Sequence, residues 1–286
     1  MAFVGVGAIG LPMAARIAAG GHAVVAIDPD ERRRELARAA GLTVAGDVAR
    51  TADADVVIVM VATPAQLYAA LCAPGGALDH MRRGALCVVM STVGREAVRA
   101  AHAAAAARGC PLLDVPVTGG VSGARRGALT LLAAGDAEAI AGARPVLERL
   151  GAILICGDEV GQGQAMKLVN QLLATVHVVA AAEALAFAER LGLDPAAALH
   201  AVGAGAAGSW MLTDRGPRMV QGEGAEVTAA IDLFVKDSGM VAAAADAAGL
   251  PTPLLAAARE VFERAADAGL GHADDSQVIQ IYREAR

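Results

Sequence analysis

A glycine-rich turn between a short apolar stretch and a helical pattern constrains the fold of this chain more than any other feature. The turn is Gly5-x-Gly7-Ala8-Ile9-Gly10. In a G-x-G-x-x-G turn the first glycine allows a tight bend, the second lets the backbone approach a pyrophosphate, and the third lets strand and helix pack closely. The amides that begin the next helix then face the phosphates. The turn therefore predicts a dinucleotide site in which these five residues contact the cofactor.

An acidic residue stands where such a site needs one. The second apolar stretch, residues 22–27, ends at Asp28, about 20 positions beyond the turn. A carboxylate there accepts hydrogen bonds from the ribose hydroxyls and repels a 2′-phosphate, so it favours NAD over NADP. Three arginines follow, Arg32 to Arg34. We interpret them as a solvated helix face, but they leave binding of NADP open.

Continuous apolar runs alternate with helical patterns through the first half. Residues 56–61 and 86–90 are two such runs, typical of parallel strands buried on both faces. Doubly wound sheets bind ligands at the carboxyl ends of their strands. Val61, Ala62 and Thr92 are therefore expected cofactor contacts. The fold class that we predict is α/β, with an N-terminal Rossmann-type doubly wound sheet.

Two loops carry less specific signals. Thr63-Pro64-x-Gln66 has the pattern of a helix N-terminus, so Gln66 is either a cofactor contact or only a helix cap. Thr118-Gly119-Gly120 follows another apolar strand pattern. Its free amides and one hydroxyl would suit a carboxylate, although an ordinary glycine-rich turn has the same composition.

A polar patch marks the start of a long helical pattern, residues 161–189. Lys167, Asn170 and Gln171 share one helix face because residues three and four apart are helical neighbours. An ordinary alternative is a lysine whose ammonium reaches water. The position after a dinucleotide-binding half favours a catalytic role.

Only helical patterns follow this segment. Asp194-Pro195 begins one helix, Ser209-Trp210 lies in an expected loop, and residues 228–248 form another helix. Trp210, the single tryptophan, is expected to fill the core. We predict two domains, residues 1–160 binding NAD and residues 161–286 forming an all-helical domain for substrate and dimerisation.

Composition and net charge limit the kinds of partner that we expect for this protein. The net charge is -6 in 286 residues, without a basic stripe, so nucleic acid is not an expected partner. Four scattered cysteines indicate a reducing compartment, and the histidine spacing predicts no metal site. Pro64 and Pro74 interrupt the longest uncharged run, which excludes it as a membrane span. With no visible signal peptide, we expect a cytoplasmic protein.

Four ordered motifs give the chain a family resemblance over nearly its whole length. They are Gly5-x-Gly7-x-x-Gly10-x-Pro12-Met13, Asp114-x-Pro116-Val117-Thr118-Gly119-Gly120, Gly161-x-Gly163-x-x-x-Lys167-x-x-Asn170 and Lys236-Asp237. Together they resemble the β-hydroxyacid dehydrogenase family, which includes 3-hydroxyisobutyrate, tartronate semialdehyde and L-threonate enzymes. The resemblance implies an NAD-dependent oxidoreductase of small hydroxy acids, commonly a homodimer or homotetramer, with a long helix between a Rossmann-type domain and a helical domain.

The resemblance also assigns roles to residues. It implies that Lys167 is the catalytic lysine and that Thr118-Gly119-Gly120 holds the substrate carboxylate. Lys236 is implied to lie near cofactor and substrate, with Asp237 beside it. We expect Lys167, partly desolvated, to exchange a proton with the substrate hydroxyl because burial favours the neutral amine. Asn170 and Gln171 would bind substrate and orient both that hydroxyl and the lysine.

Two departures from the family pattern bear on the substrate. Thr118 replaces the usual serine, and Gln171 replaces the second of two asparagines. The second change, with Gly208-Ser209-Trp210-Met211 and the Asp274-Asp275-Ser276 tail, is similar to the L-threonate branch and favours a four-carbon sugar acid. The alternatives are 3-hydroxyisobutyrate, tartronate semialdehyde (2-hydroxy-3-oxopropionate), an imine reductase, which generally lacks the lysine, and a non-enzymatic dinucleotide-binding protein.

Overall fold

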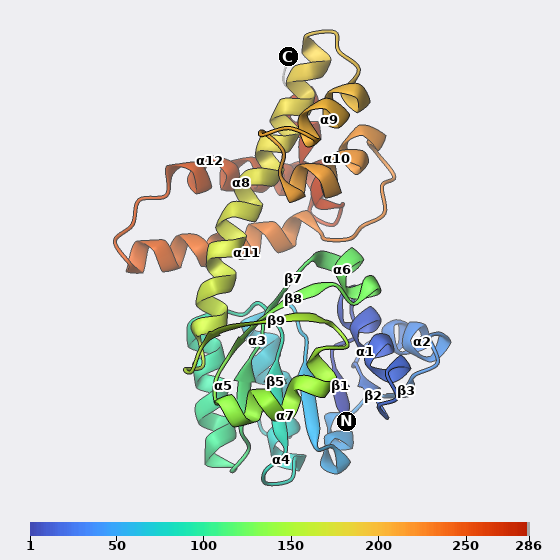
Figure 1. The fold of residues 1–286 in the computed structure, drawn as a ribbon, viewed down its shortest axis with the longest axis vertical. Helices are drawn as coiled ribbons and strands as arrows, with labels where there is room; N and C mark the ends of the chain where they lie inside the picture. The colour runs from blue at the N-terminus through green and yellow to red at the C-terminus, as the bar shows by residue number, and fades with distance from the viewer. Residues whose placement is uncertain (285–286) are drawn as a thin grey trace. The chain divides into compact units, whose positions relative to one another are not determined.

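The computed structural model describes residues 1–284 of the chain and divides it into two compact units (Figure 1). Unit 1 is residues 1–167, and unit 2 begins at Leu168. The boundary falls inside one 29-residue helix, α8 (Gln162–Arg190). Each unit has its own hydrophobic core, so each is described by itself below.

Unit 1 is built on a nine-stranded sheet in the order β3-β2-β1-β4-β5-β6-β8-β7, with β9 also paired to β8. The strands from β1 to β6 are parallel, whereas β8 runs antiparallel to β6 and β7. The order 3-2-1-4-5-6 is typical of dinucleotide-binding sheets, so the predicted Rossmann-type fold is confirmed. The bounds are β1 (Ala2–Val4), β2 (Val25–Ile27), β3 (Thr43–Ala45), β4 (Val56–Val59), β5 (Leu86–Val89), β6 (Leu112–Asp114), β7 (Val117–Thr118), β8 (Leu129–Ala134) and β9 (Gly151–Gly157).

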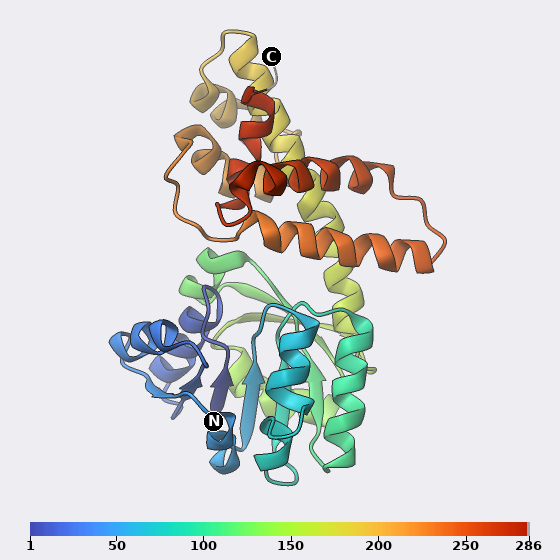
Figure 2. The same ribbon diagram turned by 180° about the vertical axis from the view of Figure 1, so that it is seen from behind.

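Helices cover both faces of this sheet (Figures 1 and 2). One apolar cluster joins α1, α2 and α7 to one face, and a second joins α3, η2, α4 and α5 to the other. Coverage of both faces explains why the central strands are continuous apolar runs: Val57, Ile58 and Val59 are fully buried. The bounds are α1 (Gly10–Ala19), α2 (Glu31–Ala39), η1 (Val48–Asp53), α3 (Pro64–Leu67), η2 (Tyr68–Cys72), α4 (Ala77–His80), α5 (Arg95–Ala107), α6 (Gly120–Arg126) and α7 (Ala137–Leu147).

Unit 2 contains only helices and short helical turns among its described residues. Its core includes Val178, Phe234 and Phe262, and the two phenylalanine rings stack with centroids 4.9 Å apart. The predicted helical region is therefore confirmed. The remaining bounds are α9 (Pro195–Gly203), α10 (Trp210–Gln221), α11 (Ile231–Ala247), α12 (Pro253–Ala265), η3 (Ala266–Leu270), η4 (Asp275–Ile279) and α13 (Gln280–Glu284).

The loop expected near Ser209-Trp210 occupies residues 204–209, and the 12-residue helix α10 begins at Trp210. Ser209 Oγ accepts a hydrogen bond from the Leu212 amide at 3.0 Å and caps that helix. One prediction at this place is wrong. Trp210 does not fill the core, since it is 49% exposed. Its ring stacks on the guanidinium of Arg215 instead, 5.6 Å from the centroid.

Helix α8 is, within residues 1–284, the one helix long and apolar enough to cross a membrane. Length and composition alone do not distinguish a membrane span from a core helix. In this fold 56% of its most apolar window is buried by other parts of the protein, which a lipid-facing helix would not need. We therefore interpret α8 as a core helix.

Candidate active site and coenzyme site

The glycine-rich turn has the geometry that a pyrophosphate site requires. Gly5 has φ of 92°, and a Cβ atom there would lie 2.2 Å from the Met60 carbonyl oxygen. A Cβ on Gly10 would lie 2.1 Å from the Gly5 oxygen. At Gly7 the nearest atom would be 3.9 Å away, on Arg33, so the backbone is open to a ligand. Ile9 directly precedes α1, and the first amides of this helix are expected to face the phosphates.

Asp28 ends β2 as predicted, but much of its carboxylate is already engaged. It is 1% exposed; Oδ2 accepts from the Val6 amide and Oδ1 from the Asp30 amide, each at 3.0 Å. The carboxylate therefore ties the phosphate turn to the β2–α2 connection. Each oxygen retains a second lone pair, so the predicted contact with ribose hydroxyls stays a prediction.

The three arginines of α2 differ from one another. Arg34 is bound by Glu31 and donates to the Asp28 carbonyl oxygen at 2.6 Å, so it is not part of a merely solvated face. Arg33 lies 3.6 Å from Asp28 and 3.8 Å from Asp30. Its guanidinium lies beside Gly7, where a Cβ atom would be 3.9 Å from Arg33 Nη1. A guanidinium at this place could bind the 2′-phosphate of NADP.

The loop after β4 contains Val61 and Ala62, whose predicted contacts with a cofactor stay predictions. The Val61 amide donates to Ser91 Oγ at 2.7 Å, and the Ala62 amide donates to Gln66 Oε1 at 2.8 Å. Thr63 caps α3 by accepting from the Gln66 amide. Gln66 therefore has a capping role, although its side chain reaches Ala62 and not the cap residue itself. Its direct contact with a cofactor stays a prediction.

The predicted carboxylate loop lies between a strand and a helix. Thr118 ends β7 opposite Thr130, and Gly119 precedes α6. Gly119 and Gly120 have φ of 121° and 62°, values that favour glycine. Helix geometry leaves the amides of the first turn without intrahelical acceptors, as binding of an anion requires. The role of this loop toward a substrate remains a prediction.

Buried polar residues that sequence reasoning missed fix the beginning of α8. Asp114 Oδ2 accepts from the amides of Gly161 and Gln164 at 3.0 and 2.9 Å. The Gln164 side chain is 1% exposed and contacts the loop after β5. Burial raises the pKa of Asp114, although these hydrogen bonds oppose the shift. The signal available in the sequence was a single acidic residue in an apolar strand; nothing local marked Gln164.

Lys167 lies one helical turn after Gln164. It is 7% exposed, which agrees with the expected partial desolvation of a catalytic amine. A lysine is seldom buried to this extent without a polar environment. Its role in catalysis is still a prediction.

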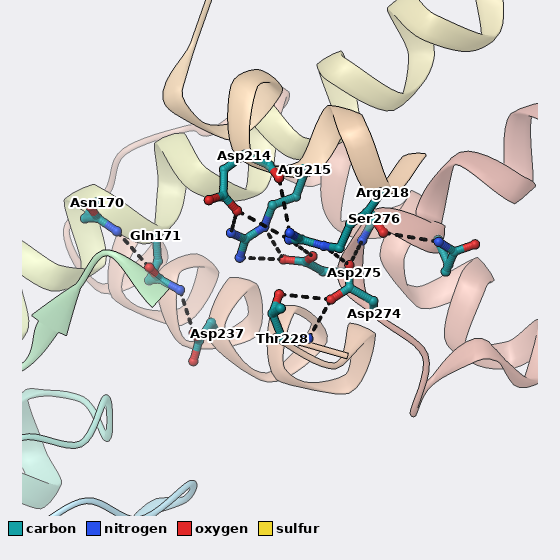
Figure 3. Close-up of polar contacts among 11 residues, drawn as sticks. Asn170, Gln171, Asp214, Arg215, Arg218, Thr228, Asp237, Asp274, Asp275 and Ser276 are labelled. Atoms are coloured by element: carbon teal, nitrogen blue, oxygen red, sulfur yellow. Dashed lines mark hydrogen bonds and ion pairs between the residues drawn. The ribbon is translucent and has the colours of Figure 1, made fainter. Parts of the chain in front are cut away.

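In unit 2 the two predicted amides belong to a chain of polar contacts (Figure 3). Asn170 Nδ2 donates to Gln171 Oε1 at 2.8 Å, and Gln171 Nε2 donates to Asp237 Oδ2 at 2.6 Å. The ammonium of Lys236 lies 2.9 Å from the other Asp237 oxygen. Four predicted substrate-site residues are therefore brought together. Asp237 is 3% exposed and holds Gln171, so its geometry suits orientation of neighbours better than direct contact with substrate.

A second polar cluster in unit 2 contains the tail motif (Figure 3). Arg215 Nε donates to Asp275 Oδ2 at 3.0 Å, and Arg218 Nε donates to Asp274 Oδ1 at 2.9 Å. Asp274 also accepts from Thr228. Burial raises the pKa of Asp275 to about 7. For Asp274 burial acts in the same direction, but hydrogen bonds outweigh it and lower the pKa.

Fold and site together define a class of protein: a dinucleotide-binding oxidoreductase with a separate helical domain. Family models specify the class further. Residues 1–161 match the NAD binding domain of 6-phosphogluconate dehydrogenase, and residues 161–282 match a family described as NAD-binding of NADP-dependent 3-hydroxyisobutyrate dehydrogenase. The chain belongs to the β-hydroxyacid dehydrogenase family of the 3-hydroxyisobutyrate dehydrogenase type, and the predicted resemblance is confirmed.

Individual relatives agree with this placement. The chain is 37% identical to L-threonate dehydrogenase of Cupriavidus necator over 282 residues, covering 98% of this chain and 94% of that protein. It is 35% identical to 3-hydroxyisobutyrate dehydrogenase of Pseudomonas aeruginosa, covering 99% and 98%. The crystal structure of 3-hydroxyisobutyrate dehydrogenase from Salmonella typhimurium superposes with a TM-score of 0.91 at 32% identity, covering 98% of each chain. The protein is a hydroxyacid dehydrogenase that binds an NAD-type coenzyme.

Proposed function

We propose that this enzyme oxidises a four-carbon sugar acid such as L-threonate with NAD, using Lys167 as general acid and base. The observation that carries the proposal is the burial of Lys167, one helical turn before two amides, on a helix whose first turn is fixed to the sheet. NAD supplies the hydride acceptor, bound by the open glycine-rich turn. The remaining chemistry belongs to the side chains of the protein.

In this proposal the amides around Thr118-Gly119-Gly120 bind the substrate carboxylate. Lys167 takes the proton from the hydroxyl group during oxidation and returns it to the carbonyl oxygen during reduction. Asn170 holds the hydroxyl in line with the amine. Gln171, fixed by Asp237, determines where the Asn170 amide lies.

The substrate class is supported by polarity and by relatives. A four-carbon sugar acid carries hydroxyl groups that a branched apolar acid lacks, and each needs a hydrogen-bonding partner when it leaves water. The pair Asn170-Gln171 offers amides to those hydroxyls. A relative at 37% identity is named L-threonate dehydrogenase. The alternatives are 3-hydroxyisobutyrate and tartronate semialdehyde.

The experiment is an NAD-reduction screen with the wild-type enzyme, the variant Lys167→Ala and the control Met166→Ala. The acids are L-threonate, D-threonate, erythronate, glycerate, 3-hydroxyisobutyrate and 3-hydroxypropionate. We expect L-threonate to give the highest kcat/KM and Lys167→Ala to lose about 100-fold or more in kcat, while its Kd for NAD is retained. Met166 is the exposed neighbour on the same helix, so its replacement controls for helix damage.

Near-normal turnover by Lys167→Ala would remove this lysine from the mechanism. A preference for 3-hydroxyisobutyrate would replace the proposed substrate while leaving the mechanism intact. Activity on cyclic imines with NADPH, tested in the same assay, would favour an imine reductase instead.

We further propose a homodimer in the cytoplasm, with one apolar stripe of α8 as the interface. Val169, Leu173 and Phe187 share a face of α8 by their spacing, and Leu191 follows directly after the helix; these four residues are 50 to 62% exposed. Exposed apolar stripes of this kind mark protein interfaces. Sedimentation equilibrium should show a dimer that Phe187→Lys weakens; a wild-type monomer at micromolar concentration would contradict the interface. All four cysteines are free, as a reducing compartment requires.

A further inference from the structure

The side chain of Gln164 uses all of its hydrogen-bonding capacity at the carboxyl ends of two neighbouring strands in unit 1. Its Oε1 accepts from the amides of Val93 and Gly94, both at 2.9 Å. Its Nε2 donates to Asp114 Oδ1 at 2.9 Å and to the Ser91 carbonyl oxygen at 3.0 Å. A primary amide offers two donor hydrogens and one acceptor oxygen with two lone pairs, so no position is left over.

The contacts continue on both sides of Gln164. Ser91 Oγ accepts from the Val61 amide at 2.7 Å, which adds the loop after β4. Asp114 accepts from the amides of Gly161 and Gln164, which adds the first turn of α8. We call the connected residues the Gln164 bracket: Val61, Ser91, Val93, Gly94, Asp114, Gly161 and Gln164.

Close packing leaves the bracket little freedom. Ser91 and Asp114 are fully buried, and Gln164 is 1% exposed. A Cβ atom on Gly163 would lie 2.5 Å from the Leu132 carbonyl oxygen and 2.8 Å from that of Asp114, so the helix backbone touches the strands directly. Buried polar networks that are fully satisfied hold one arrangement, because any displacement leaves a buried group unpaired.

The bracket connects residues of two predicted roles. Thr92, a predicted cofactor contact, stands between Ser91 and Val93, both of which Gln164 binds. Lys167 follows Gln164 by three residues on the same helix. We propose that Gln164 is a positioning residue that fixes the distance between the coenzyme loop at Thr92 and the general acid and base Lys167. This inference rests on the proposed function of Lys167 and adds a residue that touches neither substrate nor coenzyme.

A positioning role predicts a loss of turnover without a comparable loss of coenzyme binding. We expect the phosphates at the turn from Gly5 to Gly10, with which Gln164 makes no hydrogen bond, although Val61 of the bracket lies beside Gly5. A displacement of about 1 Å in a catalytic group can cost roughly 100-fold in rate. For Gln164→Met, which keeps the volume but none of the hydrogen bonds, we expect kcat to fall about 10- to 100-fold. The Kd for NAD should stay within about threefold of the wild-type value.

The matched control is Gln162→Met. Gln162 is the same residue type in the same helical turn, but its Oε1 accepts from the Glu159 amide at 2.9 Å and lies outside the bracket. The deuterium isotope effect on kcat, measured with substrate labelled at the carbinol carbon, should rise in Gln164→Met because hydride transfer becomes rate-limiting. A purely structural role would lower Tm and leave both kcat and the isotope effect of the folded fraction unchanged.

Two outcomes would overturn the inference: folded Gln164→Met with kcat within about twofold of wild type, or Gln162→Met with an equal loss. If Gln164→Met does not fold, Gln164→Glu decides, because glutamate keeps both acceptor contacts and loses both donor contacts; unchanged kcat in that variant would refute the role.

A readout independent of turnover separates this inference from the proposed function. Native-state hydrogen exchange of the Val93 and Gly94 amides should accelerate in Gln164→Met but not in Gln162→Met. If the wild-type enzyme oxidises none of the acids, the proposed function fails, and the exchange data still test the bracket. Unchanged exchange in Gln164→Met would show that Gln164 does not fix this loop.

Discussion

Two buried carboxylates, Asp114 in unit 1 and Asp275 in unit 2, are satisfied in different ways. Asp114 accepts from two backbone amides and one side-chain amide, all neutral donors. Asp275 pairs with Arg215, and its Oδ1 has no hydrogen-bond partner within the described part of the chain. The guanidinium of Arg218 lies 4.0 Å from that oxygen.

This difference shows that a buried carboxylate is stabilised by neutral donors in unit 1 and by cations in unit 2. Short neutral donors fix the position of Asp114 in several directions, which suits a place where strand ends and a helix must keep a set geometry. The cluster around Asp275 sets three carboxylates, Asp214, Asp274 and Asp275, against two guanidinium groups. These ion pairs join α10 to η4. Asp275 is the acid whose ionisation is unfavourable, because one of its buried oxygens has no hydrogen-bond partner among the described residues.

Among the variants that test this comparison, we expect Arg215→Met to lower the free energy of unfolding the most. Removal of one partner of a buried ion pair typically costs about 3–5 kcal/mol. The cost here is expected to be largest above pH 7, since Asp275 can take up a proton at lower pH. Urea unfolding followed by Trp210 fluorescence should show a lower midpoint, because the single tryptophan lies in unit 2 and reports on it. Loss of one neutral donor to Asp114 would cost less, about 1–3 kcal/mol.

The double variant Arg215→Met/Asp275→Leu is the control for that measurement. Replacement of both charged groups by apolar side chains of similar size is often neutral or stabilising. We expect it to recover most of the lost stability. A double variant as unstable as Arg215→Met would mean that the arginine acts through Trp210 or Asp214 and not through Asp275.

A smaller effect concerns pH. Burial raises the pKa of Asp275 from its ordinary 3.8 to about 7 in the folded protein. Between these values the folded state binds the extra proton, so stability is highest below pH 4 for this group and falls as pH rises toward 7. We expect a decrease of roughly 1–3 kcal/mol in the free energy of unfolding of unit 2 across this window.

The variant Asp275→Asn sharpens the comparison because asparagine does not titrate. Its unfolding midpoint, again followed by Trp210 fluorescence, should be flatter than wild type between pH 4 and 7. Asp274 cannot mimic the effect, since its lowered pKa confers stability that is lost only as pH falls below its ordinary 3.8. Parallel slopes for wild type and Asp275→Asn would show that Asp275 is ionised throughout.

Local sequence patterns predicted most of the fold and part of the site. The strand, glycine turn and helix from Ala2 to Ala19 are determined by neighbours in the chain, and their geometry matches the expectation. The gathering of Asn170 and Gln171 on one helix face follows from helical spacing alone. The hydrogen bond from Gln171 to Asp237, 66 positions further along the chain, was not predicted.

Other features could not be predicted from local patterns. The helix that begins at Trp210 was not predicted, because serine caps helices but is also common in turns. The exposure of Trp210 depends on Arg215, whose position is set by its ion pair with Asp275, 60 residues away. Gln164 resembles any surface glutamine in sequence, yet its side chain binds four partners that lie 50 or more positions away.

The sequence by itself determined that this chain holds a dinucleotide on a parallel sheet, because a tight turn, a close backbone approach and two-sided burial each restrict the residues locally. Only the tertiary structure decided which polar residues are buried together and which amides orient them. Hydrogen bonds act over about 3 Å between groups that may be 50 or more positions apart in the chain. No local pattern records such pairings, so Asp114, Gln164 and Asp275 acquired their roles from the fold.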